Sequence, residues 1–278
     1  MKLSAEQVKG RLRNEAQEQN ADARLLLRLF MMERFLERLS VSEYRDNVIV
    51  KGGILVTAMV GVSMRSTMDI DATIRNINLS VYDVEKMISN IIAIDVDDDV
   101  YFQIKDISRI MEDAEYPGLR ITLDAILGKL TSPLKIDIST GDIITPREIK
   151  FDYRLMLEDR SIDLWSYNIE TILAEKIQTI LSRGILNTRM RDFYDIYALM
   201  LKYKTEIDYQ VLKDALEATC YKRNTVNLLE RTDLIYDILD NPDVMKGWEA
   251  YQKRYSYARD VSFINIADAL KMIVLKIV

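Results

Sequence analysis

The chain has 278 residues, of which 49% are hydrophobic and 29% charged, and its few glycines and prolines predict a folded, helix-rich protein. It contains no histidine, which excludes Ser-His-Asp and Cys-His nucleophilic sites and histidine-bound zinc or iron. The formal net charge of −6 argues against broad, sequence-independent binding of nucleic acid, which depends on an excess of Lys and Arg.

The N-terminal half begins with helical spacing of apolar residues over 5–39, which predicts one or two amphipathic helices. An apolar stretch at 48–50 leads into Lys51-Gly52-Gly53 and a short helix over 54–60. Alternating patterns then predict strands, with one helix among them: strands over 68–74, 100–107, 119–127 and 134–139, and a helix over 81–92.

Past about residue 165 the strand patterns end, and helical periodicity predicts a run of helices: 169–181, 192–201, 209–218, 226–239, 244–255 and 263–277. We therefore predict an α+β fold, with a mixed sheet and flanking helices followed by a C-terminal helical bundle. The predicted domains are N-terminal helices over 1–45, an α/β domain over 46–164 and a helical domain over 165–278.

Cysteine usage and hydropathy indicate the compartment. Cys220 is the only cysteine, so neither an intrachain disulfide nor a thiolate cluster can form. The N-terminus lacks the apolar core of a signal peptide, and no later apolar run approaches membrane-spanning length. We expect a cytoplasmic protein without a membrane partner.

Acidic residues are concentrated in the α/β half. Residues 69–163 contain 20 acidic and 11 basic residues, a local balance of −9, so the rest of the chain carries +3. Without histidine or paired cysteines, any metal must be held by oxygen, and carboxylates suit Mg²⁺ or Mn²⁺.

The segment Met68-Asp69-Ile70-Asp71-Ala72 carries the first candidate ligands. Side chains alternate along a strand, so Asp69 and Asp71 project together, about 7 Å apart, while Met68, Ile70 and Ala72 face the core. Such a pair can hold divalent metal, although a half-buried strand with its polar face in water has the same pattern.

Two further features stand in order around this pair. Lys51-Gly52-Gly53 precedes a helix, where backbone N–H groups can hold phosphate oxygens, although an ordinary turn has the same composition. On the strand over 134–139, Lys135, Asp137 and Ser139 share one face. If that strand lies beside 68–74, three carboxylates converge on a site for two metal ions.

The series Lys51-Gly-Gly53, Arg65-Ser-Thr-Met-Asp-Ile-Asp71 and Lys135-Ile-Asp137 resembles the polymerase-β-like nucleotidyltransferase superfamily. One departure is that 15 residues separate Gly53 from Asp69, somewhat more than that superfamily usually has. Glu175-Lys176 and Arg191-Asp192-Phe-Tyr-Asp195 are similar to the later motifs of the AbiEii/AbiGii toxins of abortive-infection, type IV toxin–antitoxin pairs. The resemblance spans roughly residues 48–200.

The later motif also stands out by its residues alone. Lys176 falls near the middle of an apolar helical arc, where a lysine is costly unless an anion meets it. It either forms a structural ion pair with Asp192 or Asp195 or reaches a triphosphate across the domain boundary. The helical wheel places Asp192 at the edge of an apolar arc and Asp195 further toward solvent, so we rank Asp192 higher as a site residue.

Basic and aromatic residues of the helical half allow two interpretations each. Arg183, Arg189 and Arg191 lie in a stretch without acids and could contact the phosphates of a nucleotide or RNA, or could belong to a solvated connection. The tyrosines at 251, 255 and 257 have spacings that favour core or interface packing over base stacking.

The resemblance implies in-line nucleotidyl transfer. The implied catalytic residues are Asp69, Asp71, Asp137, Lys176 and Asp192, with Asp69, Asp71 and Asp137 holding Mg²⁺ or Mn²⁺. The implied nucleotide-binding residues are Lys51, Gly52, Gly53, Arg65, Ser66, Thr67, Lys176, Arg191 and Asp195. It further implies a phage-defence toxin that attaches NMP from an NTP to an RNA acceptor such as the 3′ end of tRNA, releases pyrophosphate, and is countered by a separately encoded antitoxin.

Two alternatives remain open at this point. One keeps the chemistry but transfers the nucleotide to a small molecule, such as an aminoglycoside, or to a protein hydroxyl; the acidic net charge favours these acceptors over RNA. The other is a non-catalytic module that binds nucleotide or a partner protein. Three carboxylates that repel one another without metal argue against the module.

Overall fold

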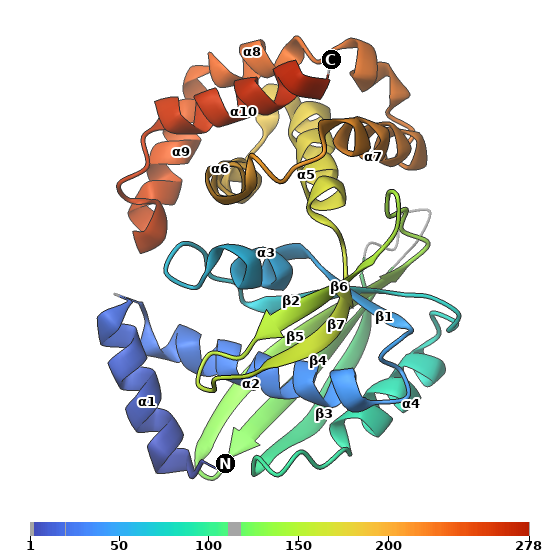
Figure 1. Cartoon of the computed structure of the whole chain (residues 1–278), viewed down its shortest axis with the longest axis vertical. Coiled ribbons are helices and arrows are strands. Elements are labelled where there is room, and N and C mark those ends of the chain that lie inside the picture. The colour runs from blue at the N-terminus through green and yellow to red at the C-terminus, as the bar shows by residue number, and fades with distance from the viewer. Residues whose placement is uncertain (1–2, 20, 111–117, 278) are drawn as a thin grey trace. The chain divides into compact units, whose positions relative to one another are not determined.

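The computed structural model describes residues 3–19, 21–110 and 118–277 (Figure 1). The chain divides into two compact units. The sheet unit comprises residues 1–58, 66–142 and 149–166, and the helical unit comprises residues 59–65, 143–148 and 167–278. The N-terminal helices thus cluster with the sheet, and the short segments 59–65 and 143–148 cluster with the C-terminal helices.

The sheet unit is built on a seven-stranded sheet of order β3-β4-β5-β2-β1-β7-β6, counted over the described residues. β2 pairs with β5, and β1 with β7, in parallel, and the remaining pairs are antiparallel. The strands are β1 (Val48–Lys51), β2 (Asp69–Ile74), β3 (Val100–Ile110), β4 (Gly118–Leu127), β5 (Leu130–Thr140), β6 (Ile149–Arg154) and β7 (Ser161–Ser166).

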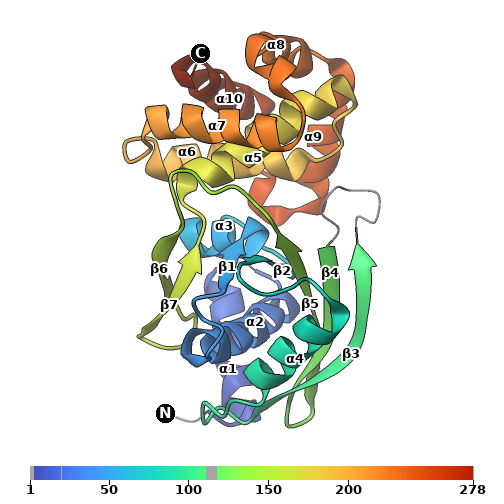
Figure 2. The ribbon, with the colours of Figure 1, turned by 90° about the vertical axis from the view of Figure 1, so that its right-hand side faces the viewer.

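Helices cover the apolar side of this sheet. α2 (Ala23–Val41) packs against β5 and β7, α4 (Val81–Ile92) packs beside it against β3, and α1 (Ala5–Glu18) packs on α2 (Figure 2). Side chains cap these helices: Ser4 forms a capping box with Gln7, and Asp22 accepts a hydrogen bond from the backbone of Arg24. α3 (Gly52–Val60) follows β1 directly.

The helical unit gathers its helices around α6, which packs against α5, α9 and α10. Most of α6 is buried, including Phe193 and Ile196, neither of which is exposed to solvent. The helices are α5 (Ile169–Arg183), α6 (Met190–Tyr203), α7 (Tyr209–Lys222), α8 (Leu234–Leu239), α9 (Pro242–Arg254) and α10 (Phe263–Ile277).

The predicted α+β fold is confirmed, and two local predictions are wrong. β6 and β7 were not expected. They form an antiparallel hairpin at the edge of the sheet, in which β6 is mostly exposed and shows no clear alternation, whereas β7 alternates exposed and buried residues. The single helix predicted over 226–239 is a 3₁₀ turn (Val226–Glu230) followed by the short α8. Thr232 and Asp233 stand at the break, and such side chains favour local turns over helix interiors.

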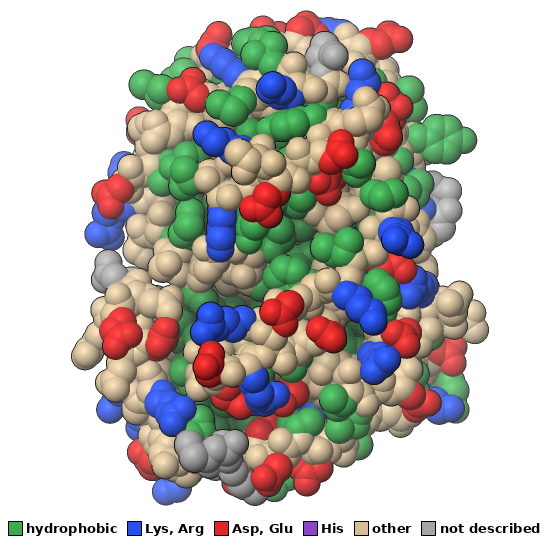
Figure 3. All heavy atoms as spheres, viewed as in Figure 1, with side chains coloured by type: hydrophobic (Ala, Val, Ile, Leu, Met, Phe, Trp, Pro, Cys, Tyr) green, Lys and Arg blue, Asp and Glu red, His purple; other side chains and the backbone are tan. Residues whose placement is uncertain are grey.

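The surface mixes charges of both signs. On the face drawn in Figure 3, acidic and basic side chains are interspersed among scattered hydrophobic ones. Within the described parts of the chain, no helix combines the length and apolar character needed to cross a membrane.

Candidate active site

Register brings the predicted carboxylates together on one face of the sheet. β2 runs parallel to β5 with Asp71 opposite Asp137 and Asp69 opposite Lys135. Ile70 and Ile136 point to the buried face, so Asp69, Asp71 and Asp137 share the other face. The two strands are neighbours, which is the condition under which the sequence predicts that the three carboxylates converge. Met68 was expected in the core but is 43% exposed, because the strand begins only at the next residue.

The glycine pair lies against Asp71. Gly52 has φ +64°, and a Cβ there would stand 2.2 Å from Asp71 Oδ2, so this position requires glycine. The backbone N–H of Gly53 donates to the same Oδ2 atom at 3.3 Å. The turn between β1 and α3 therefore holds the Asp71 carboxylate in the described structure.

The surroundings of Asp71 disfavour the ionisation of its carboxyl group. Burial raises the pKa of its carboxyl above the usual range, and the charges of Asp137 and Asp69 raise it further, against the Gly53 N–H and Lys51. Carboxylates that oppose one another's ionisation favour a proton or a cation among them.

Arg120, which the sequence interpretation did not single out, supplies such a cation. Its Nε and Nη2 atoms donate to the two Asp137 oxygens at 2.7 and 2.6 Å. The hydrogen bond and charge of Asp137 raise the pKa of Arg120, with smaller contributions from Asp69 and Asp71. The register of β4 with β5 sets Arg120 opposite Asp137, and the alternation of β4 could have revealed that they share a face.

Lys51 is engaged beside this site. Its Nζ atom donates to Ser139 Oγ at 2.8 Å and forms an ion pair with Asp142. Ser139 Oγ in turn donates to Asp142 at 2.9 Å. The Lys51 side chain is only 17% exposed, so it lies along the wall of the site.

The donor set fits a hard divalent cation by its chemistry. Among the described residues no group of three or more acidic or cysteine side chains stands close enough to hold a metal ion. Asp69 and Asp71 nevertheless present carboxylate oxygens on one face. Burial is the main cause of the raised pKa of Asp71, and the repulsion from Asp137 and Asp69 that adds to it is the charge pattern that a metal ion relieves. Asp137 would have to exchange Arg120 for the metal.

Residues 65–67, which precede β2, differ in burial and in their contacts. Arg65 is 1% exposed, and its guanidinium donates to both oxygens of Asp195 at 3.0 and 3.3 Å. Thr67 is buried and its hydroxyl donates to the Asp69 carbonyl at 3.3 Å, while Ser66 is half-buried. Of the three predicted nucleotide contacts here, Arg65 is placed as a structural brace.

The helical unit holds the second set of predicted residues. Lys176 Nζ lies 3.2 Å from Asp192 Oδ1 and 2.6 Å from Asp195 Oδ2. Asp195 is fully buried, so placing it toward solvent was wrong; its pairing with Arg65 keeps its charge inside. Burial acts to raise the pKa of Asp195, but Arg65 and Lys176 outweigh burial and lower it to about 2.

Asp192 accepts fewer hydrogen bonds than Asp195. It is 3% exposed, and Arg189 Nε approaches its Oδ2 atom at 2.8 Å without hydrogen-bond geometry. Burial opposes the charge of Lys176, but Asp195 and Asp192 raise its pKa. Arg191 is half-buried and hydrogen-bonded to Tyr255, and Arg183 is exposed.

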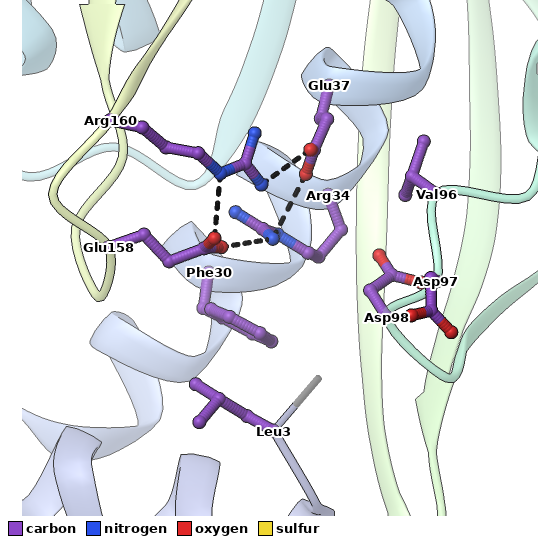
Figure 4. Close-up of a pocket in the computed structure, with 9 residues that line it drawn as sticks. All are labelled: Leu3, Phe30, Arg34, Glu37, Val96, Asp97, Asp98, Glu158 and Arg160. Atoms are coloured by element: carbon purple, nitrogen blue, oxygen red, sulfur yellow. Dashed lines mark hydrogen bonds and ion pairs between the residues drawn. The ribbon is translucent and has the colours of Figure 1, made fainter. Parts of the chain in front are cut away.

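A separate cavity of about 250 Å³ lies in the sheet unit, away from the carboxylate face, beside α2 (Figure 4). Arg34 pairs there with Glu158 at 2.7 Å and with Glu37 at 3.0 Å, and Arg160 pairs with the same two glutamates. These ion pairs line the cavity, and Arg160 remains 44% exposed to solvent.

Comparison with known proteins identifies the family of the chain. The family model described as "Nucleotidyl transferase AbiEii toxin, Type IV TA system" matches residues 34–270. No curated protein sequence matches the chain.

Two solved structures from Helicobacter pylori share the fold. The protein JHP933 has 15% sequence identity and a TM-score of 0.53, covering 91% of this chain and 93% of its own. A protein provisionally described as a nucleotidyltransferase has the same identity and TM-score, covering 91% of this chain and 96% of its own.

Proposed function

Since the chain belongs to the AbiEii nucleotidyltransferase toxin family of type IV toxin–antitoxin systems, we propose that it transfers NMP from an NTP to an RNA acceptor. The acceptor we propose is the 3′ end of tRNA, and pyrophosphate is released. The observation that carries the proposal is the parallel register that sets Asp71 opposite Asp137 on the face that also bears Asp69.

The proposed reaction is one in-line substitution at phosphorus. The acceptor hydroxyl oxygen forms a bond to the α-phosphorus, and the bond from that phosphorus to the bridging oxygen of the β-phosphate breaks. Pyrophosphate leaves, and the proton of the hydroxyl passes to the carboxylate on the acceptor side, Asp137. The developing charge lies on phosphoryl oxygens.

The carboxylates Asp69, Asp71 and Asp137 would hold Mg²⁺ or Mn²⁺, which supplies electrostatic stabilisation of those oxygens. Gly52 places the turn against Asp71, and the backbone of Gly53 and the side chain of Lys51 are the groups that we assign to the phosphates. Lys176 and Arg191, with Ser66 and Thr67, are the remaining proposed nucleotide contacts, and Asp192 orients Lys176.

We propose the toxin activity because the chain belongs to this family. A protein that blocks acceptor ends of RNA in the cytoplasm would stop growth of a phage-infected cell, and a separately encoded antitoxin would keep it silent otherwise. Family membership supports the antitoxin partner.

The test is incorporation of label. The protein is incubated with each labelled NTP and Mg²⁺ in total RNA and in cell extract, and the labelled macromolecule is identified. We expect label in small RNA and none with the Asp71→Ala variant. Asp152→Ala, which removes an exposed strand aspartate, is the matched control and should transfer normally. Label in protein or in a small molecule would mean that the acceptor is not RNA. Nucleotide transfer by the Asp71→Ala variant would contradict the assignment of Asp71 as a catalytic residue.

A non-catalytic nucleotide-binding module is favoured by one observation, the pairing of Asp137 with Arg120. Calorimetry separates the two functions. Nucleotide binding that requires Mg²⁺ and collapses in an Asp69→Ala variant supports the enzyme, whereas binding that is independent of metal supports the module.

A further inference from the structure

We propose that a tyrosine and arginine surface at the end of α9 binds an unpaired nucleobase of the RNA acceptor. Its residues are Arg191, Arg254, Tyr255 and Tyr257, and we call it the Tyr255 surface. The choice of RNA rests on the proposed function; the location of the binding site is new.

The segment that contains Tyr255 is locally basic and aromatic. Residues 250–259 contain three basic residues and three tyrosines and no acid, in a protein whose net charge is −6. Basic residues interleaved with aromatic ones are the pattern that proteins use to follow a phosphate backbone and stack its bases. A charge of +3 over ten residues is complementary to a polyanion.

The aromatic rings form a supported stack. The Tyr255 ring lies 4.6 Å from the Tyr251 ring and 5.4 Å from the Tyr257 ring, with an interplanar angle of 30° to the latter. Tyr251 is buried, whereas Tyr255 and Tyr257 are half-buried. The predicted packing role thus holds for Tyr251, and the other two tyrosines leave part of their surface to solvent.

Hydrogen bonds hold the stack in place. The hydroxyls of Tyr251 and Tyr257 share a hydrogen bond of 2.8 Å, and the buried Tyr194 donates to the carbonyls of Met64 and Tyr257. All of these residues belong to the helical unit. A base that stacks on the surface therefore meets rings that are already ordered, which lowers the entropy cost of binding.

Two arginines frame the stack. The Arg254 guanidinium lies 5.4 Å from the centroid of the Tyr255 ring, and Arg191 hydrogen-bonds the Tyr255 side chain. Arginine beside an aromatic ring can contact the phosphate next to a stacked base. Arg189, 54% exposed, stands two residues from Arg191, and its guanidinium pairs with Asp192.

The chemistry selects single-stranded RNA over a duplex or a protein. Paired bases present no free face to a tyrosine, whereas an unpaired base does. Tyrosine and arginine are enriched in protein interfaces too, but the charge of +3 over residues 250–259 favours a polyanionic partner. An unpaired 3′ tail next to a helical stem meets both requirements, a free base and a dense phosphate charge.

The test measures binding without catalysis. The full chain is titrated, without NTP and in the presence of a chelator, against a fluorescent RNA hairpin that ends in an unpaired 3′ tail. We expect Tyr255→Ala to weaken binding roughly 5- to 150-fold, the equivalent of about 1–3 kcal/mol, and Tyr255→Phe to bind like the wild type. Arg254→Gln should lower the slope of log affinity against log salt by about 0.7.

Matched controls separate a site from general effects. Tyr221→Ala removes a tyrosine that is 76% exposed on α7 and should bind the tail normally. A blunt hairpin should bind weakly and respond little to Tyr255→Ala. Thermal melting checks that each variant is folded, and Arg254→Gln, which changes an exposed side chain, tests the same surface if Tyr255→Ala does not fold.

The outcomes distinguish this inference from the proposed function. Unchanged tail affinity in Tyr255→Ala and Arg254→Gln, or an equal loss for tailed and blunt hairpins, overturns the Tyr255 surface even if RNA is labelled. If tail binding depends on Tyr255 but the protein transfers no nucleotide, the Tyr255 surface is supported and the proposed transferase function is rejected. Asp71→Ala should retain tail binding.

Discussion

At the scale of single residues, the position of the Asp71 carboxylate depends on the lack of a Cβ atom at Gly52. Gly52 approaches it with φ +64°, a conformation that strains any other residue, and leaves no room for a Cβ. The positive φ angle and the close contact with Asp71 therefore each require a glycine at position 52.

Gly52→Ala should therefore lower the free energy of unfolding by more than about 1 kcal/mol and abolish nucleotide transfer, because Asp71 must move. Chemical denaturation and the labelling assay measure the two effects. Gly10→Ala is the matched control: nothing lies within 4 Å of a Cβ there, and alanine in the exposed part of α1 should stabilise by about 0.5–1 kcal/mol. Full activity in Gly52→Ala would contradict this role.

Glu33 is a second residue whose environment decides its charge. Its carboxylate accepts hydrogen bonds from the Met156 N–H at 3.1 and 3.2 Å, yet burial dominates and raises its pKa from 4.5 to about 8. The folded state keeps a proton that the unfolded state has already lost between these values, so stability falls as pH rises through this window.

The slope for this single group is at most about 1.4 kcal/mol per pH unit. Urea denaturation at pH 5.5 and 7.5 should show the wild type less stable at the higher pH, and Glu33→Gln should reduce that difference. Glu85→Gln, a change on the exposed face of α4, should leave it unchanged. Equal pH dependence in wild type and Glu33→Gln would show that Glu33 titrates near its ordinary pKa.

At the scale of elements, buried charge joins three separate segments of the helical unit. Asp195 on α6 meets Arg65, which ends the segment 59–65, and Lys176 on α5. Lys202 and Tyr203, at the other end of α6, both donate to the Met59 carbonyl. α6 therefore holds the segment 59–65 at both of its ends.

Asp195→Ala should lower the free energy of unfolding by about 3–5 kcal/mol, because it leaves Arg65 and Lys176 buried without their anion. Denaturant titration measures the loss. Asp243→Ala, which breaks an exposed pair with Lys246, should change stability by less than about 0.5 kcal/mol. A small loss in Asp195→Ala would mean that the cations reach solvent or another anion.

At the scale of the whole molecule, composition constrains the metal chemistry. There is no histidine and a single cysteine, and that cysteine, Cys220, is buried. Any metal that supports the reaction must therefore be bound by oxygen. Residues 69–163, with their balance of −9, supply the carboxylates.

A chelator should abolish nucleotide transfer, and Mg²⁺ or Mn²⁺ added in excess should restore it. The melting temperature should rise with Mg²⁺ in the wild type, because the ion binds the folded carboxylates, and should not rise when Asp69 and Asp71 are both replaced by asparagine. Transfer that continues in the chelator, or an equal rise in the double variant, would count against the metal site.

The sequence alone determined the fold class, the pairing of Asp69 with Asp71 on one face, and the membership of the motifs in an ordered series. These follow from local rules: alternation places side chains on a strand, periodicity places them on a helix, and composition excludes whole chemistries. Only the tertiary structure decided the partners. Arg120 meets Asp137 through strand register, and Asp195 is buried rather than exposed because Arg65, 130 residues away in sequence, meets it. Such pairs depend on how elements pack, and no local pattern encodes that.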